Sequence, residues 1–247
     1  MRRSSVRLAI GLLLLIAALV ALAPATIVDA ALASRTHGQW RIAGASGRWW
    51  HGRGILASAD GQARMPVAWR VAVLQLLRGE VSIELDPEGG AARGTVDLRA
   101  GGLSLHDLAL RVPAALVAAL APRKAPLVVG GTLDLDAAAF EWTPTGGSGS
   151  LAAQWQRARA VVAGTPVDLG TVSLALAPRA GRLSGTLSNA GGDLGIEGTL
   201  SGSTGSIDAA MTLRPSSSTP EVLRRGLPML GAQDATGAVH MAWHGGW

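Results

Sequence analysis

Two pairs of side chains in this chain have the types and spacing that could support chemistry. His240 and His244 stand four residues apart in a segment that alternates like a strand, so they would share one face and could ligate a metal ion. Asp134 and Asp136 also share a strand face, as paired acid–base carboxylates can. We find no carboxylate or thiol close to the histidines in the sequence and expect a solvated or interface pair. The aspartates are expected on the wet side of a half-exposed strand.

Motifs of the common enzyme classes do not occur in the sequence. It contains no Gly-x-Ser-x-Gly turn, no glycine-rich phosphate loop with lysine and no His-Glu-x-x-His zinc motif. Cysteine is also absent, which excludes disulfides, thiolate metal sites and cysteine nucleophiles. The sequence therefore predicts a protein that is not an enzyme, with no catalytic residue, no cofactor and no metal.

Tryptophan and arginine are crowded together early in the chain. The whole chain has eight tryptophans, one phenylalanine and no tyrosine. The simplest interpretation places these tryptophans in the core of a sheet. The alternative is contact with lipid headgroups or with the polar rim of a partner, where both residue types are enriched. The candidate contact residues are Trp40, Arg48, Trp49, Trp50, Arg53, Trp69 and Arg70.

Alternation of apolar and polar residues predicts a mainly β structure, a twisted antiparallel sheet or meander with two short helices. Strands are expected over residues 81–85, 94–100, 103–110, 131–136, 171–176, 183–187, 194–200, 207–213 and 239–243, separated by glycine-rich turns. Helices are expected over residues 113–120 and 222–230, each with a proline near its start. A weak repeat opens at Gly94, Gly131 and Gly170. Residues 143–150 are turn-rich and would divide the β-rich part into halves, 29–142 and 151–247.

An apolar run of 21 residues, 8–28, follows Arg2, Arg3 and Arg7. It is long enough to cross a bilayer, and the arginines place residues 1–7 in the cytoplasm and residues 29–247 outside it. A cleaved signal peptide is the competing interpretation. The net charge of +5 falls to +2 without these three arginines, so nucleic-acid binding is not expected.

Motifs along the chain resemble those of the family of protein N of the bacterial type II secretion system. The matching segments are Gly47-Arg48-Trp49-Trp50-His51-Gly52, Val67-Ala68-Trp69-Arg70, Leu76-Leu77-Arg78-Gly79, Gly130-Gly131-Thr132-Leu133-Asp134-Leu135, residues 151–158, Leu169-Gly170-Thr171-Val172, residues 192–198 and Leu227-Pro228-Met229-Leu230-Gly231. Arg48 stands where the family element often has threonine. The resemblance implies a single-pass inner-membrane protein with a periplasmic domain, no enzymatic residue, and the outer-membrane secretin and inner-membrane platform as partners.

Two other classes of function are compatible with the sequence. A β-groove that carries lipid between membranes, as in AsmA-like and lipopolysaccharide-transport proteins, would share the anchor and the meander and would show a continuous apolar face. A periplasmic hydrolase would need a nucleophile and a base brought together only in space.

Overall fold

The computed structural model describes residues 22–61, 63–76, 81–85, 92–99, 101–120, 128–162, 164–179, 181–203 and 206–246. The predicted cytoplasmic segment and residues 8–21 of the predicted anchor lie outside this part, as do residues 77–79 of one family motif. Of the helices in the described residues, none has both the length and the apolar character to cross a membrane.

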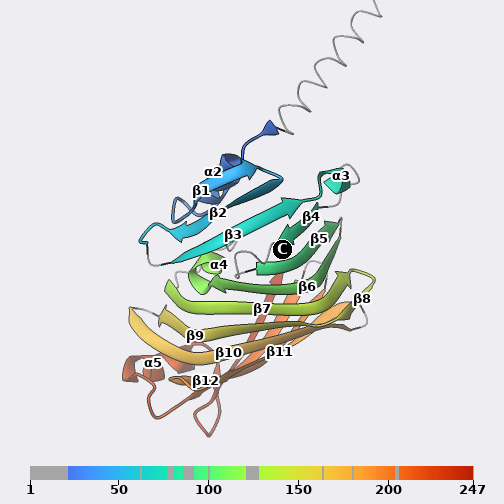
Figure 1. Cartoon of the computed structure of the whole chain (residues 1–247). Helices are drawn as coiled ribbons and strands as arrows, with labels where there is room; N and C mark the ends of the chain where they lie inside the picture. Colours follow the sequence, from blue (N-terminus) through green and yellow to red (C-terminus); the bar gives the residue numbers. More distant parts are fainter. Residues whose placement is uncertain are drawn as a thin grey trace, which may run out of the picture.

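The described strands form one open antiparallel sheet in which nearly every strand pairs with its neighbour in sequence (Figure 1). Only β14 and β15 are exchanged in the order, and β8 pairs with β7 to one side of the path. The sheet twists strongly, and the C-terminal strands run steeply across the direction of the middle ones (Figure 1). The strands are β1 Trp40–Arg48, β2 His51–Ser58, β3 Arg64–Val71, β4 Val81–Leu85, β5 Ala92–Arg99, β6 Gly102–Pro113, β7 Val128–Thr143, β8 Gly146–Gly149, β9 Leu151–Val162, β10 Thr165–Arg179, β11 Arg182–Ala190, β12 Leu194–Ser203, β13 Ser206–Pro215, β14 Ala232–Gln233 and β15 Val239–Gly246.

The predicted strands each coincide with or overlap a strand of the structure, and both predicted helices form. The helices are α2 Thr26–Arg35, α3 Val73–Leu76, α4 Ala114–Leu120, α5 Glu221–Gly226 and the short 3₁₀ helix η2 Leu227–Met229. Helix α2 overlaps the end of the predicted anchor, so residues 26–28 belong to a separate helix that packs on the sheet. The break falls at Pro24, which forms an isolated bridge to Arg48 of β1.

The two faces of the sheet differ sharply in polarity because successive side chains on a strand point to opposite faces. Cross-strand partners from β6 to β15 form an apolar row on one face: Leu110, Leu135, Ala153, Leu174, Leu187, Gly198, Met211 and Met241. The adjacent row on the other face is polar throughout: Arg111, Asp134, Gln154, Ser173, Ser188, Glu197, Thr212 and His240.

Buried side chains form three separate clusters. The first joins Trp40, Ile42 and Leu56 to Val112 and to Leu116 of α4, with α2 packed beside it. The second, in the middle of the sheet, holds Leu105, Leu108, Ala137 and Phe140. The third holds Leu194, Leu213, Leu227 and Val239, so η2 covers the end of the sheet. Helices therefore cover the apolar face near its two ends.

The glycine repeat marks irregularities in the ladder. Gly94, Gly131 and Gly170 all have positive φ, at 114°, 99° and 67°, and each lies at a shift in strand register. A Cβ on Gly131 would clash with the carbonyl oxygens of Gln156 and Arg157 on β9. These are β-bulges, which bend a sheet and increase its twist. The weak sequence repeat thus records three bends.

The turn-rich segment over residues 143–150 forms a hairpin in which β8 pairs back onto the end of β7. β7 also pairs directly with β9, so the ladder of the sheet continues past this segment.

Candidate functional site

The predicted tryptophan–arginine region forms one end of the first three strands. β1 and β2 are joined by a two-residue turn, Trp49-Trp50, with Arg48 opposite His51 in the register. Residues 23–25, which precede α2, pass beside this turn, whereas β1 itself begins at Trp40 at its other end. The backbone N–H of Trp49 donates to the carbonyl of Ala23 at 3.1 Å, and the N–H of Ala25 donates to the carbonyl of Gly47 at 3.1 Å.

Aromatic and basic groups are stacked at the turn. The Arg48 guanidinium lies 5.8 Å from the centre of the Trp50 ring, a cation–π distance. The Trp50 ring is 6.1 Å from the His51 ring. The Trp50 carbonyl accepts the N–H of Val71 at 2.6 Å, which ties the turn to the end of β3.

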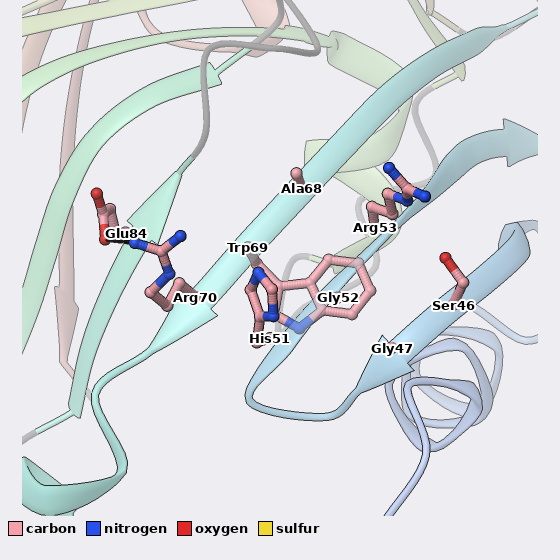
Figure 2. A pocket seen from close by; sticks show the side chains of 9 residues that line it. All are labelled: Ser46, Gly47, His51, Gly52, Arg53, Ala68, Trp69, Arg70 and Glu84. Atoms are coloured by element: carbon pink, nitrogen blue, oxygen red, sulfur yellow. Dashed lines mark hydrogen bonds and ion pairs between the residues drawn. The ribbon is translucent and has the colours of Figure 1, made fainter.

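A pocket of about 400 Å³ lies beside the turn (Figure 2). The indole of Trp69 packs against Gly52, where a Cβ would lie 2.5 Å from the ring, and its Nε1–H donates to the Trp49 carbonyl at 2.8 Å. The Arg70 guanidinium is 3.2 Å from Glu84 of β4. The complete lining is Ser46, Gly47, His51, Gly52, Arg53, Ala68, Trp69, Arg70 and Glu84.

The structure separates the candidate contact residues into three groups. Trp40 is only 4% exposed and belongs to the first core cluster, where the simplest interpretation of the tryptophans places it. Arg48, Trp49 and Trp50 form the turn. Arg53, Trp69 and Arg70 line the pocket.

Among the pocket residues that the sequence did not single out, two are titratable, His51 and Glu84. His51 directly follows Trp49 and Trp50 in the sequence, and this position could have placed it among the candidate contact residues. Glu84 reaches the pocket because its strand partner is Arg70, a pairing that no local pattern reveals.

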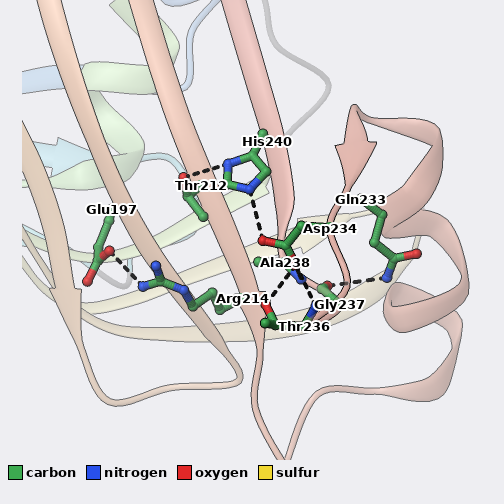
Figure 3. A network of polar contacts seen from close by, with 9 residues as sticks. All are labelled: Glu197, Thr212, Arg214, Gln233, Asp234, Thr236, Gly237, Ala238 and His240. Atoms are coloured by element: carbon green, nitrogen blue, oxygen red, sulfur yellow. Dashed lines mark hydrogen bonds and ion pairs between the residues drawn. The ribbon is translucent and has the colours of Figure 1, made fainter.

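The histidine pair lies on the polar face, and each histidine has a carboxylate partner that we did not foresee. His240 Nε2 is 3.0 Å from Asp234, and its Nδ1 is 3.1 Å from Thr212 (Figure 3). His244 Nδ1 is 2.6 Å from Asp208 of β13. Our statement that no carboxylate lies close by is wrong for Asp234, which stands six residues before His240 in the sequence.

Asp234 organises the turn that precedes β15. Its carboxylate accepts hydrogen bonds from the backbone N–H and the hydroxyl of Thr236 and from the N–H of Ala238, at 2.7–3.0 Å. The Thr236 hydroxyl, followed by the His240 ring, holds the pKa of Asp234 well below its ordinary value. This arrangement stabilises a tight turn. Across the described residues, no group of three or more histidine, aspartate or glutamate side chains is placed to hold a metal ion.

Asp134 and Asp136 have different surroundings: the first is buried and the second is exposed. Asp134 is buried, not solvated as expected, because it accepts from Arg111 at 2.5 Å and from Gln156 at 2.6 Å on the neighbouring strands. The bond to Asp134 raises the pKa of Arg111. Asp136, two residues along the strand, is exposed. Asp134 therefore links three strands of the polar face, which is a structural role.

The sequence was compared with models of known protein families. A sequence model of type II secretion system protein N matches residues 38–242. The chain belongs to the type II secretion system protein N family. The match begins just before β1 and ends within β15, so it covers the whole order of the sheet. No curated protein and no solved structure matches the chain. Protein N is an accessory component of the secretion machinery and its family is not a known enzyme family.

Proposed function

We propose that this protein N is a non-enzymatic, single-pass inner-membrane component whose periplasmic sheet contacts the outer-membrane secretin, the inner-membrane platform or both during export of folded proteins. The family match carries this proposal. The apolar run over residues 8–28 supports the anchor, and the open sheet supplies a large surface outside it.

The test is cross-linking in cells that carry the secretion operon. Because the chain has no cysteine, a photoreactive or thiol-directed cross-linker can be placed at a single new cysteine without background. We would compare Ser188→Cys, on the exposed polar face, with Arg64→Cys at the start of β3. Mass spectrometry should identify secretin or platform subunits at one of these positions. Capture of neither, in cells that export cargo normally, would contradict the proposal.

A second candidate function, lipid transfer between the two membranes, is favoured by the apolar face. Cross-strand neighbours such as Leu174, Leu187 and Met211 continue one apolar row, and these side chains are only partly buried. A row of half-exposed apolar side chains presents no hydrogen-bonding group, which suits acyl chains.

Adjacent residues of β11 provide a matched test of lipid transfer. Leu187 lies on the apolar face and is partly buried, whereas Ser188 lies on the polar face and is exposed. If the apolar face carries lipid, full-length protein purified from membranes should retain phospholipid, and Leu187→Asp should lose most of it while Ser188→Asp keeps it. Equal lipid content in both folded variants would rule out this face.

A further inference from the structure

The contact between residues 23–25 and the tryptophan turn fixes which end of the molecule is nearest to the predicted anchor. The apolar run leads directly to Ala23, whose carbonyl accepts the Trp49 N–H at 3.1 Å. The tryptophan turn is therefore within one hydrogen bond of the residues that leave the predicted anchor. If the apolar run crosses the inner membrane, this turn lies at the surface of that membrane.

The side chains at this end suit the boundary between headgroups and water. Apolar residues are exposed there: Leu22 is 61% exposed, Ile27 at the start of α2 is 51% exposed, and Val73 at the start of α3 is 37% exposed. Tryptophan is enriched at this boundary, and tryptophan and arginine side chains both act as interfacial anchors. Arg48 is held over the Trp50 ring, which directs a cation and an aromatic group to the same place.

The pocket beside the turn is basic. Its lining includes Arg53, Arg70 and His51, with Glu84 as the acidic member. Glu84 is already paired with Arg70. Within the described part of the chain, no carboxylate forms an ion pair with Arg48 or Arg53, although Arg41 of the same strand pair is neutralised by Asp29 at 2.6 Å. Arg48 and Arg53, at the end that carries the tryptophan turn, are therefore available to attract an anion.

The opposite end of the same strands carries charges of both signs. There the β2–β3 connection carries Asp60, which accepts from the Ser58 hydroxyl, and Arg64 opens β3 beside Ala57. Arg64 also forms no ion pair with a described carboxylate, so the first end differs by its tryptophans and by its contact with residues 23–25, which follow the predicted span.

We propose that the Trp49-Trp50 turn and the pocket formed by His51, Arg53 and Arg70 bind the anionic phospholipid headgroups of the membrane that holds the anchor. Arg48 and Arg53 contact headgroup phosphates, and the tryptophans lie among the headgroups. This contact fixes the orientation of the sheet against the membrane surface. The proposal rests on the predicted anchor and is independent of the secretion partners, so each can fail without the other.

The experiment uses the full-length chain in lipid nanodiscs. A single cysteine at Val73, near the turn, carries a fluorophore, and a second preparation carries it at Ala235 in the exposed turn before β15. Discs contain a lipid with a nitroxide quencher on its headgroup, in phosphatidylcholine alone or in a mixture rich in phosphatidylglycerol. We expect strong quenching at position 73 that increases with phosphatidylglycerol, and little quenching at position 235.

Paired arginine variants decide the mechanism. Arg48→Gln and Arg53→Gln should each shift the equilibrium away from the docked orientation by roughly fivefold, as expected for a basic residue near an anionic surface, and high salt should do the same. Arg64→Gln, at the other end of the strands, should have no effect. Circular dichroism confirms that each variant is folded. Quenching that is independent of phosphatidylglycerol, or equal in all three variants, would overturn the proposal.

Discussion

Trp69 and Trp50 differ in their structural roles, although the sequence analysis named both as candidate contact residues. Trp69 packs on Gly52 and donates its indole N–H to the Trp49 carbonyl, whereas Trp50 lies in the turn. We predict that Trp69→Ala lowers the free energy of unfolding by about 2–3 kcal/mol because it removes packing and a hydrogen bond. Trp50→Ala should lower it by less than about 1 kcal/mol while reducing contact with membrane or partner. Urea unfolding of the two variants checks this; equal losses would mark Trp50 as core.

Both the backbone conformation and the space at position 131 require glycine. Its φ is 99°, and a Cβ would meet two carbonyl oxygens of β9. Gly131→Ala should therefore destabilise the protein by about 1–3 kcal/mol or shift the bulge. Gly146, where a Cβ would meet nothing within 4 Å, is the control and should tolerate alanine. Thermal unfolding of both variants measures the difference, and a tolerant Gly131 would show that the bulge can move.

Asp234 makes the last turn of the chain sensitive to acid. Its hydrogen bonds hold its pKa below the ordinary value of 3.8, so the carboxylate form is favoured in the folded state. The stabilisation is complete above pH 3.8 and is lost as the pH falls toward the lowered pKa. Asp234→Asn should therefore be less stable than the wild type near neutral pH, and the difference should shrink in acid. Denaturation midpoints across the acid range measure it; a constant difference would contradict the assignment.

Among the secondary-structure elements, strands are predicted best where apolar and polar residues alternate strictly. The strands over residues 81–85 and 207–213 alternate cleanly because one face is apolar and the other is wet. β9 was missed because Ala152, Ala153 and Ala158 blur that alternation. Helix α2 was missed because its first residues continue the apolar run, and only Pro24 signals the break. The carboxylate partners of the histidines were missed because Asp208 reaches His244 through strand register, which depends on the whole order of strands.

Helix α2 has a second role as a cap for the first edge of the sheet. Asp29 accepts the N–H of Ile42 at 2.7 Å and bonds Arg41, which holds the pKa of Asp29 below its ordinary value. Asp29→Ala should cost about 1–2 kcal/mol, because an amide of the edge strand loses its acceptor. Glu221→Ala, which breaks only an exposed ion pair with Arg225, should cost less than about 0.5 kcal/mol. Urea unfolding separates these outcomes, and equal small losses would show that water replaces the cap.

Across the whole molecule, the sheet is an open ladder stabilised by separate clusters, with its two edges treated differently. The first edge is covered by α2 and the entering chain. At the last edge β14 pairs only with Val239 and His240 of β15. Stability in such a fold is not uniform, because an amide exchanges when its own region opens.

Hydrogen exchange should reveal this gradient along the strand order. β6 and β7 pair over ten positions and contribute the buried side chains of the central cluster, including Phe140 at 3% exposure, so their amides should be the most protected. Residues 241–246 of β15 have β13 on one side and no described strand on the other, so their outward amides should exchange first. Mass spectrometry of exchanged peptides from the full-length protein in nanodiscs gives the order. Protection of residues 241–246 equal to that of β7 would mean that another chain pairs with this edge, since an unpaired edge cannot retain its outward amide hydrogens.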